Sequence, residues 1–321
     1  MPWIIGIDEA GYGPNLGPFV MTSAACRVPE KLAGANLWRV LNRAVRRQSS
    51  EADGRLLVED SKLVYSPSRG LRDLETGVLG VLSGWRNGDQ VRLAHYVDWL
   101  CPANHNELRS EPWYAGTSPL PVRAEEAELE AAAARFEKAC CKREVVWGLV
   151  RSVVVCPARF NQVTQEWGSK GAVLALALAE LVRANHELNG EGEPASFFVD
   201  KHGGRNFYAA MLQHALPEGF VVAQQEGMAR SVYLVHGLKR DLRLIFEPRA
   251  DGHHFCVALA SMVSKYLREL LMLEFNGFWE RHVPGLKPTA GYHGDASRFF
   301  RAIRPTMEQL RIAKRMVWRQ K

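Results

Sequence analysis

The sequence lacks long apolar runs, internal repeats and low-complexity tracts. No uncharged apolar stretch reaches the about 18 residues that a membrane-spanning helix needs. Near the N-terminus, Asp8 interrupts the apolar stretch that a secretion signal would require. A hydrophobic fraction of 47% is that of an ordinary globular protein and excludes a wholly disordered chain. We therefore expect a soluble, cytoplasmic protein that does not contact membranes.

Cysteine pairs with metal-binding spacing are also missing. None of the six cysteines belongs to a Cys-x-x-Cys pair or to a cluster with histidine: Cys26, Cys101, Cys140, Cys141, Cys156 and Cys256. This pattern argues against a zinc ribbon and against a secreted disulfide framework. We expect reduced thiols that serve as small apolar or surface residues.

The charge balance is mildly basic. Lys and Arg number 41 and Asp and Glu 35, which gives a net charge of +6 over 321 residues. An excess of this size suits a polyanionic partner such as nucleic acid, but it does not identify one.

Apolar strands alternate with helical patterns along the chain, which predicts an α/β fold. The strongest helical spacing runs over 257–273. Further helices are expected over 36–48, 70–82, 125–141 and 206–216, over 160–188 with a break near Gly168, and over 298–321, where the segment is cationic.

The stretch 85–144 differs from the rest, because prolines cluster in it before an Ala- and Glu-rich helical segment. We expect an insertion that packs on the main body. The chain is therefore divided into a catalytic core of 1–84 and 145–272, the insertion 85–144, and a C-terminal helical extension 273–321.

Carboxylates recur at the ends of apolar strands. Asp8 and Glu9 end one such strand, Asp200 ends another, and Asp251 lies just before a helix. Converging carboxylates repel one another, and a hard divalent cation such as Mg²⁺ or Mn²⁺ relieves that repulsion. Two such ions can promote phosphodiester hydrolysis. Separate aspartates that cap helices or lie in turns are an equal alternative on spacing alone.

The sequence motifs around these residues resemble those of a known protein family. Residues 6–14, GIDEAGYGP, followed by Gly17 and Pro18, closely resemble the opening motif of type II ribonucleases H. Further blocks follow in the family's order: DSKL at 60–63, FNQ at 160–162, FFVD at 197–200, AD at 250–251, ALASMVSKYLRE at 258–269 and GY at 291–292. The resemblance covers most of the chain except 85–144 and the last turns.

The resemblance implies an RNase H-like fold, with a mixed central sheet flanked by helices. It also implies four catalytic, metal-binding acids, Asp8, Glu9, Asp200 and Asp251, and two Mg²⁺ or Mn²⁺ ions. The implied reaction cuts RNA in RNA–DNA hybrids, or ribonucleotides embedded in DNA, and leaves a 3′-hydroxyl and a 5′-phosphate. Adjacent side chains of an ideal strand point to opposite faces, so the strand should end or distort at Asp8 and Glu9.

The resemblance further implies a substrate-binding set. A glycine loop presents backbone groups to the ribose, a tyrosine stacks on a sugar, and lysines and an arginine contact phosphate. Carried over to this chain, the set comprises Gly11, Tyr12, Gly13, Lys62, Ser261, Lys265, Arg268 and Tyr292.

Some residues depart from the family's pattern. Tyr12 stands where the family's loop has arginine, Lys201 and His202 follow Asp200 where glycine is usual, and Glu269 replaces an aspartate. The change at Tyr12 leaves the substrate preference open. Stacking on a base or sugar and an ordinary exposed tyrosine are equal alternatives for Tyr12.

Two other functions compete with the leading one. The same metal chemistry could act on DNA or on structured junctions. A nucleic-acid-binding protein without turnover would draw affinity from the basic C-terminal segment through phosphate contacts. Four acids would repel phosphate in the absence of metal, which favours an enzyme. We expect it to act as a monomer.

Overall fold

The computed structural model describes residues 1–47, 53–83, 91–103, 105–188 and 192–320. Within them, seven strands form one mixed sheet in the order β7-β2-β1-β8-β11-β10-β9. Strands β7, β2 and β1 are antiparallel neighbours, β8 is parallel to β1 and β11, and β10 and β9 continue antiparallel. The bounds are β1 Trp3–Ala10, β2 Phe19–Arg27, β7 Val146–Val155, β8 Ala195–Asp200, β9 Phe220–Gln225, β10 Ser231–His236 and β11 Leu242–Glu247.

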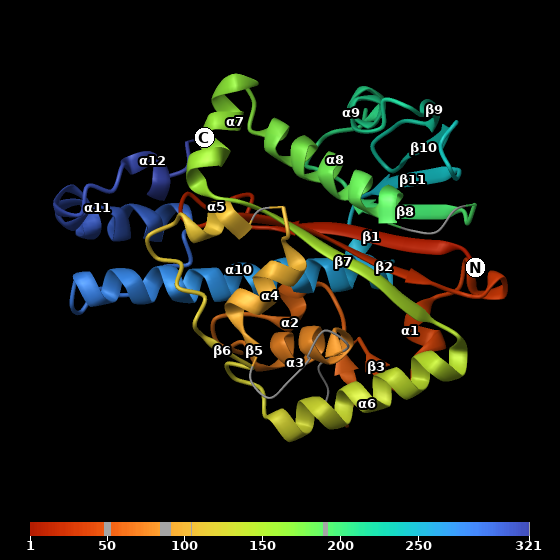
Figure 1. Cartoon of the computed structure of the whole chain (residues 1–321), viewed down its shortest axis with the longest axis horizontal. Helices are drawn as coiled ribbons and strands as arrows, with labels where there is room; N and C mark the ends of the chain where they lie inside the picture. The colour runs from red at the N-terminus through yellow and green to blue at the C-terminus, as the bar shows by residue number, and fades with distance from the viewer. Residues whose placement is uncertain (48–52, 84–90, 104, 189–191, 321) are drawn as a thin grey trace.

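Helices cover both faces of this sheet, which confirms the α/β class and the mixed central sheet. One face packs on α7 Pro157–Glu166, α8 Gly171–Leu188 and α9 Ala209–Ala215. The long helix α10 Phe255–His282 crosses the other face (Figure 1). Beyond α10 lie α1 Leu37–Val40, α2 Ser61–Val64, α3 Arg72–Val81, α4 Leu93–Leu100 and α6 Glu126–Arg143.

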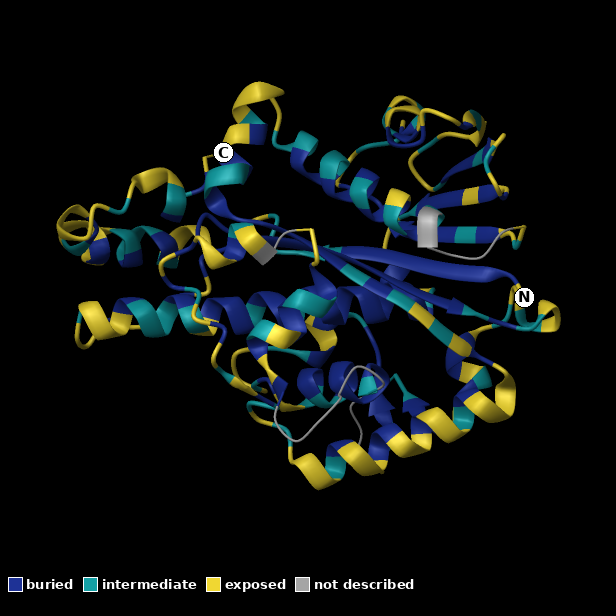
Figure 2. Cartoon of the chain, viewed as in Figure 1, coloured by how far each residue is buried: buried dark blue, intermediate teal, exposed yellow. Residues whose placement is uncertain are grey.

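The alternation of side chains along β1 explains this two-sided cover. Ile4 belongs to the apolar cluster around α10, while Ile5 and Ile7 belong to the cluster around α8. Gly6 faces α10, where a Cβ would lie 2.1 Å from the Cys256 carbonyl carbon. Strand and helix therefore meet backbone to backbone, and the centre of the molecule is buried (Figure 2).

The stretch 85–144 contains α4, α5 His105–Arg109, α6 and the short strands β5 Val91–Arg92 and β6 Pro119–Leu120. Most of its buried apolar side chains join the cluster around α10, while Trp113 packs in a separate cluster with Phe275 and Phe299. Buried Glu75 of α3 accepts hydrogen bonds from the backbone N–H groups of residues 122–124, at 2.6–2.7 Å. Glu75 also accepts one from the Tyr266 hydroxyl at 2.6 Å. This stretch thus packs on the same core as α3 and α10.

Two of the expected helices are wrong in extent. The segment 36–48 is helical only over α1, because β3 Val45–Arg46 pairs with β4 Leu56–Leu57. The cationic segment is divided into α11 His293–Gln309 and α12 Lys314–Val317, with a left-handed turn at Arg311 (φ 55°) between them. The break expected near Gly168 is confirmed, since α7 ends at Glu166 and α8 begins at Gly171.

The described residues also contain the 3₁₀ turns η1 Glu30–Leu32 and η3 Ala250–Gly252. Among the residues that the structure describes, no helix is long and apolar enough to cross a membrane.

Candidate active site

The predicted acids lie where two parallel strands separate. Strand β1 pairs with β2 up to Ala10, but it pairs with β8 only as far as Ile7 and Val199. Asp8 and Asp200 are the next residues of the two strands, so their carboxylates lie at the same end of the sheet. In α/β proteins, ligand-binding sites are often found at the carboxyl ends of the strands, where the strand order changes direction.

Asp251 reaches the same place from the short 3₁₀ turn η3 Ala250–Gly252, which follows β11. The Ala250 N–H donates a hydrogen bond to Asp200 Oδ1 at 3.0 Å, which fixes the turn against β8. The Gly252 N–H donates to Asp251 Oδ1 at 2.9 Å and orients that carboxylate. Three separate chain segments thus bring acids to one edge of the sheet.

The four carboxylates interact electrostatically. Burial, followed by the charges of Glu9 and Asp200, raises the pKa of Asp8. Burial and the charge of Asp200 raise the pKa of Glu9 to about 7. Burial also raises the pKa of Asp200, while burial and the charge of Asp60 raise that of Asp251 to about 6. These shifts are typical of carboxylates gathered in a partly desolvated site.

Asp60, which the sequence did not single out, is a fifth acid at this site. It caps α2, where its carboxylate accepts a hydrogen bond from the Lys62 N–H at 2.9 Å. The next-but-one side chain, Lys62, is close enough for its charge to lower the pKa of Glu9, Asp200 and Asp251, against the larger effect of burial. The DSKL block at 60–63 contains both residues, but only Lys62 was predicted to belong to the site.

Hydroxyl groups on α10 hold β1 in place beside the acids. Ser264 Oγ donates to the Asp8 carbonyl at 3.0 Å and shares a second hydrogen bond, of 2.8 Å, with the Thr22 hydroxyl. Ser261 hydrogen-bonds to the Asp8 carboxylate, which lowers the pKa of Asp8 against the larger effect of burial. Ser261 Oγ also lies 3.0 Å from Ser61 Oγ on α2. The helix α10 therefore positions both the backbone and the carboxylate of Asp8.

The donor set suits a hard divalent cation, because every candidate ligand is a carboxylate oxygen. Glu9 Oε2 is buried and has no hydrogen-bond partner among the described residues. Among all the residues that the structure describes, however, no group of three or more His, Cys, Asp or Glu side chains is already arranged to hold a metal ion. The carboxylates are gathered here, and holding an ion between them would require their side chains to reorient.

The predicted glycine loop folds over Arg268. Gly11 has φ 83°, and a Cβ there would lie 2.5 Å from Arg268 Nε. Arg268 is only 1% exposed, and its Nη2 donates to the Ala290 carbonyl at 3.0 Å. The predicted phosphate contact of Arg268 does not fit this position, because the guanidinium is buried beneath the loop. Lys265 Nζ pairs with Glu269 Oε1 at 2.6 Å and lies over the Tyr65 ring.

Tyr292 stands beside the loop and is 54% exposed. A Cβ on Gly13 would lie 3.9 Å from its Cε1. The preceding residue, Gly291, accepts hydrogen bonds from the N–H groups of Asn15 and Leu16 at 2.8 and 3.2 Å. The glycine loop and the segment before α11 are therefore joined through their backbones.

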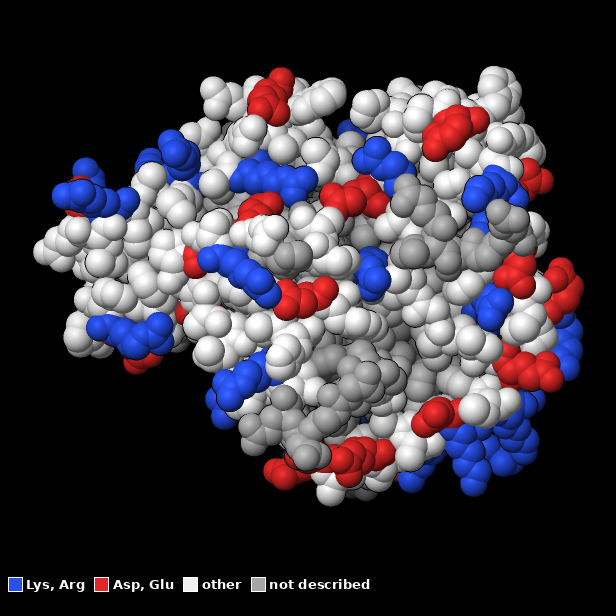
Figure 3. All heavy atoms as spheres, in the orientation of Figure 1, with Lys and Arg blue, Asp and Glu red and all other residues white. Residues whose placement is uncertain are grey.

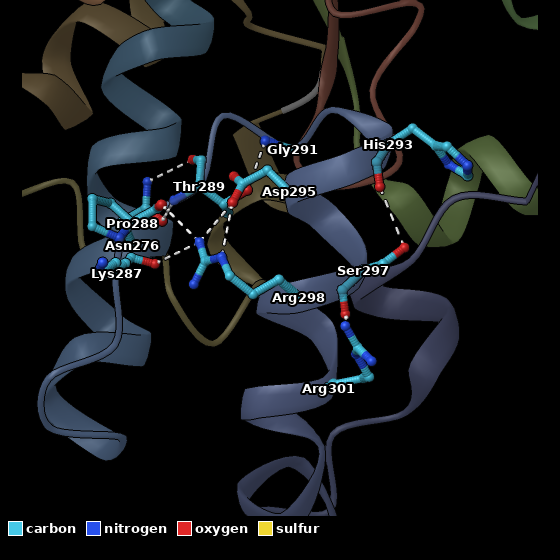
Figure 4. A network of polar contacts seen from close by, with 10 residues as sticks. All are labelled: Asn276, Lys287, Pro288, Thr289, Gly291, His293, Asp295, Ser297, Arg298 and Arg301. Atoms are coloured by element: carbon cyan, nitrogen blue, oxygen red, sulfur yellow. Dashed lines mark hydrogen bonds and ion pairs between the residues drawn. The ribbon is translucent and has the colours of Figure 1, made fainter.

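Polar contacts fix the segment that presents Tyr292 (Figure 4). Thr289 and Asn276 exchange hydrogen bonds of 2.9 and 3.0 Å, which tie the segment to α10. Arg298 pairs with Asp295 at 2.6 Å and donates to the carbonyls of residues 287 and 288. The tyrosine thus projects from a backbone that is held on both sides.

The last described residues also support the loop. Trp318 forms a β-bridge with Leu16, and the Arg319 N–H donates to the Asn15 carbonyl at 2.8 Å. Asn161 of α7 donates to the carbonyls of residues 315 and 318 and accepts from the Gln320 N–H at 2.7 Å. We call residues 314–320 the C-terminal strap, since they bind the outer side of the glycine loop.

Lys201 and His202, which depart from the family's pattern after Asp200, both form hydrogen bonds with nearby residues. Lys201 Nζ donates to Asn206 Oδ1 at 3.0 Å and to the Gly227 carbonyl. His202 is buried, and its backbone N–H donates to the Tyr208 hydroxyl at 3.3 Å. Burial, and then the charge of Arg205, lower the pKa of His202 to about 3. Lys201 and His202 therefore shape the loop after β8.

The two histidines after Asp251 bind Glu247. His254 Nε2 and His253 Nδ1 lie 2.8 and 3.3 Å from Glu247 Oε1, and the His254 ring stacks on Phe198.

Basic and acidic side chains are interspersed on the face shown in Figure 3. The charge on that face does not by itself select a polyanion.

The sequence matches no protein-family model and no curated protein. Among solved structures, ribonuclease H2 from Pyrococcus horikoshii OT3 is similar, with 16% identity, a TM-score of 0.48, and coverage of 98% of this chain and 92% of that chain. Ribonuclease HII of Archaeoglobus fulgidus, in a complex with PCNA, has 14% identity, a TM-score of 0.44, and coverage of 99% and 94%. Bst-RNase HIII in complex with Mn²⁺ has 15% identity, a TM-score of 0.39, and coverage of 99% and 66%.

Proposed function

We propose that the protein is a metal-dependent endonuclease of the type II ribonuclease H kind. It hydrolyses the RNA strand of RNA–DNA hybrids or cuts at ribonucleotides embedded in DNA, leaving a 3′-hydroxyl and a 5′-phosphate. The observation that carries this proposal is the gathering of Asp8, Glu9, Asp200 and Asp251 at one end of two separating strands. Their charges interact even though their positions in the sequence lie far apart.

In this proposal, Asp8, Glu9, Asp200 and Asp251 hold Mg²⁺ or Mn²⁺. Bound ions would neutralise the carboxylates, activate water and stabilise the charge that develops on the phosphodiester. The buried Glu9 Oε2, which has no partner among the described residues, supports this role.

The other residues orient these acids and the substrate. Ser261 and the Ala250 N–H hold the carboxylates of Asp8 and Asp200. Lys62 supplies positive charge beside them, which offsets the repulsion between the acids and a phosphate. The exposed ring of Tyr292 is available to stack on a sugar or base.

The backbone of the glycine loop at Gly11 and Gly13 provides close approach to a ribose, whose 2′-hydroxyl distinguishes RNA from DNA. Within the proposed substrate set, Arg268 acts by supporting this loop from beneath, and Lys265 belongs to the same ion-pair network through Glu269. Tyr12 adds an aromatic ring where the family's loop has arginine.

A cleavage assay with matched duplexes tests the proposal. All-DNA, RNA–DNA hybrid and single-ribonucleotide duplexes are incubated with Mg²⁺, Mn²⁺ or a chelator. We expect metal-dependent cutting of the hybrid or at the ribonucleotide, loss of cutting in Asp8→Asn, and full activity in the control Asp241→Asn, which changes an exposed carboxylate.

Other results would overturn the proposal in distinct ways. Cutting of the all-DNA duplex would indicate a DNA or junction nuclease. Binding that weakens with salt, without products in either metal, would indicate a binding protein. Metal-dependent cutting that persists in Asp8→Asn would show that the carboxylate site has been assigned to the wrong residues.

A further inference from the structure

Tyr12 lies between the acids and two cationic side chains. Its ring packs edge-on against Phe19, with the centroids 6.3 Å apart. Lys170 Nζ lies 4.5 Å from the centroid of the Tyr12 ring, in the geometry of a cation–π contact. Arg205 is close enough for its charge to lower the pKa of the Tyr12 phenol, against the larger effects of burial and of Glu9. The ring therefore borders both the carboxylates and a positive region.

Two loops bring these cations together. Lys170 ends the connection between α7 and α8, and Arg205 belongs to the loop between β8 and α9. A Cβ on Gly171, the first residue of α8, would lie 3.5 Å from Arg205 Nη2, so the Arg205 side chain lies beside the start of α8. The Tyr208 hydroxyl donates to the Arg205 carbonyl at 3.2 Å, and the Arg205 N–H donates to the His202 carbonyl at 3.2 Å. The arginine is thus mounted on an anchored backbone.

The guanidinium of Arg205 has no ion pair with a carboxylate among the residues that the structure describes. A partly exposed cation of this kind is available to bind an anion from outside the chain. The Lys170 ammonium lies over two rings, 4.5 Å from the centroid of Tyr12 and 5.9 Å from that of Phe160.

The same two loops each expose a large aromatic side chain. Trp167, three residues before Lys170, is 66% exposed, and Phe207, two residues after Arg205, is 72% exposed. Exposed aromatic rings beside cations are typical of surfaces that bind unpaired nucleic-acid strands, where the rings stack on bases and the cations contact phosphates. The bases of a duplex are already stacked and offer no free faces to such rings.

We propose that Tyr12, Trp167, Lys170, Arg205 and Phe207 form a binding surface, the Tyr12 rim, for a single-stranded segment that flanks the duplex in the active site. This inference rests on the proposed function, because the rim adjoins the carboxylates through Tyr12 and Glu9. Lys62 lies with α2, on the side of the sheet that packs on α10. Lys170 directly precedes α8, which packs on the opposite face. Cations on both sides offset the repulsion between the acids and the incoming strand.

The rim also explains the departure at Tyr12. The loop position that carries arginine in the resembling family here carries a ring, and the positive charge comes instead from Lys170 and Arg205 on neighbouring loops. The protein would therefore favour hybrids or ribonucleotide-containing duplexes with a single-stranded flank over fully paired ones.

Binding measurements that need no catalysis test the rim. Fluorescence anisotropy with Mg²⁺ compares two all-DNA ligands, a blunt duplex and the same duplex with a short single-stranded flank, over a range of salt concentrations. We expect the wild-type protein to bind the flanked duplex about tenfold more tightly. The double variant Trp167→Ala/Phe207→Ala should lose that preference.

The double variant Lys170→Ala/Arg205→Ala should bind the flanked duplex more weakly and should bind the blunt duplex about as the wild type does. Its slope of log affinity against log salt should fall by between about 1.4 and 1.8, because two phosphate contacts are removed. The conservative double variant Lys170→Arg/Arg205→Lys should restore most of the slope. The matched control, Lys142→Ala/Arg143→Ala, removes two exposed cations from the end of α6 and should leave the slope unchanged.

An equal affinity of the wild-type protein for both ligands would overturn the inference, as would rim variants that behave like the α6 control. Failure of the proposed function gives a different result. In that case the flank preference and its loss in the rim variants are observed, but none of the duplexes of the cleavage assay is cut.

Discussion

The stability of the metal-free protein should depend on Glu9, and the dependence should follow pH. Burial and the charge of Asp200 raise the pKa of Glu9 from its ordinary value of 4.5 to about 7. Below pH 4.5 the group is protonated in both the folded and the unfolded chain, so it has no effect on the free energy of unfolding. Between pH 4.5 and 7 the unfolded chain ionises first, and stability falls as the pH rises.

The magnitude follows from that pKa. The ionised Glu9 destabilises the folded protein by about 3 kcal/mol above pH 7. Replacing Glu9 by glutamine removes this penalty and also weakens the repulsion that raises the pKa of Asp8. For a chain of this length, 3 kcal/mol corresponds to a rise of about 5 °C in Tm.

Thermal unfolding in chelator, followed by circular dichroism from about pH 5 to about pH 8, measures this effect. We expect Glu9→Gln to melt near the wild-type Tm at the acidic end and above it at the alkaline end. The control Glu218→Gln changes an exposed carboxylate and should follow the wild type. Added Mg²⁺ or Mn²⁺ should stabilise the wild type more than Glu9→Gln. A wild-type Tm that does not fall with pH, together with an unstabilised Glu9→Gln, would refute the reasoning.

Three further substitutions test the packing around the site. Gly6→Ala should destabilise the protein by about 3 kcal/mol or more, because its Cβ would collide with the Cys256 backbone, and urea unfolding measures this. Ser264→Ala loses hydrogen bonds to the Asp8 carbonyl and to Thr22, so the same assay should show a loss of about 1–2 kcal/mol. Asn161→Ala removes three bonds to the C-terminal strap; it should cost about 2–3 kcal/mol and expose residues 314–320 to proteolysis, and an uncut strap would contradict its assigned role.

The sequence predicted the elements whose pattern is local. The apolar runs before Asp8 and Asp200 marked two buried strands. The expected end of the first strand at Asp8 and Glu9 is wrong on the side of β2, because β1 pairs with β2 up to Ala10. The break near Gly168 was equally local, since glycines interrupt the helical spacing there. Because the α/β alternation follows from the same runs, the class of the fold could be predicted as well.

Contacts between distant segments could not be predicted in this way. Glu75 looks like one more polar residue of a helix, yet it is buried because three backbone N–H groups from 122–124 converge on it. The helix expected over 36–48 ends early because Val45 finds a partner strand at Leu56. In both cases a tertiary contact overrides the local pattern.

Arg268 shows the same limit within the site. Its place in the ALASMVSKYLRE block indicated a role near the acids, but the sequence could not show that Gly11 lies directly above its side chain. Asp60 was overlooked for a related reason: its interaction with Asp251 depends on how η3 folds back beside α2.

The C-terminal strap has a consequence for the order in which the protein becomes functional during synthesis. The first strand and the glycine loop are synthesised well before residues 318 and 319, which contact Leu16 and Asn15. Until then the loop lacks its outer support, so a nascent chain could carry most of its acids in place and still hold substrate poorly. Substrate binding would therefore become possible only after the strap has been synthesised and has docked on the loop.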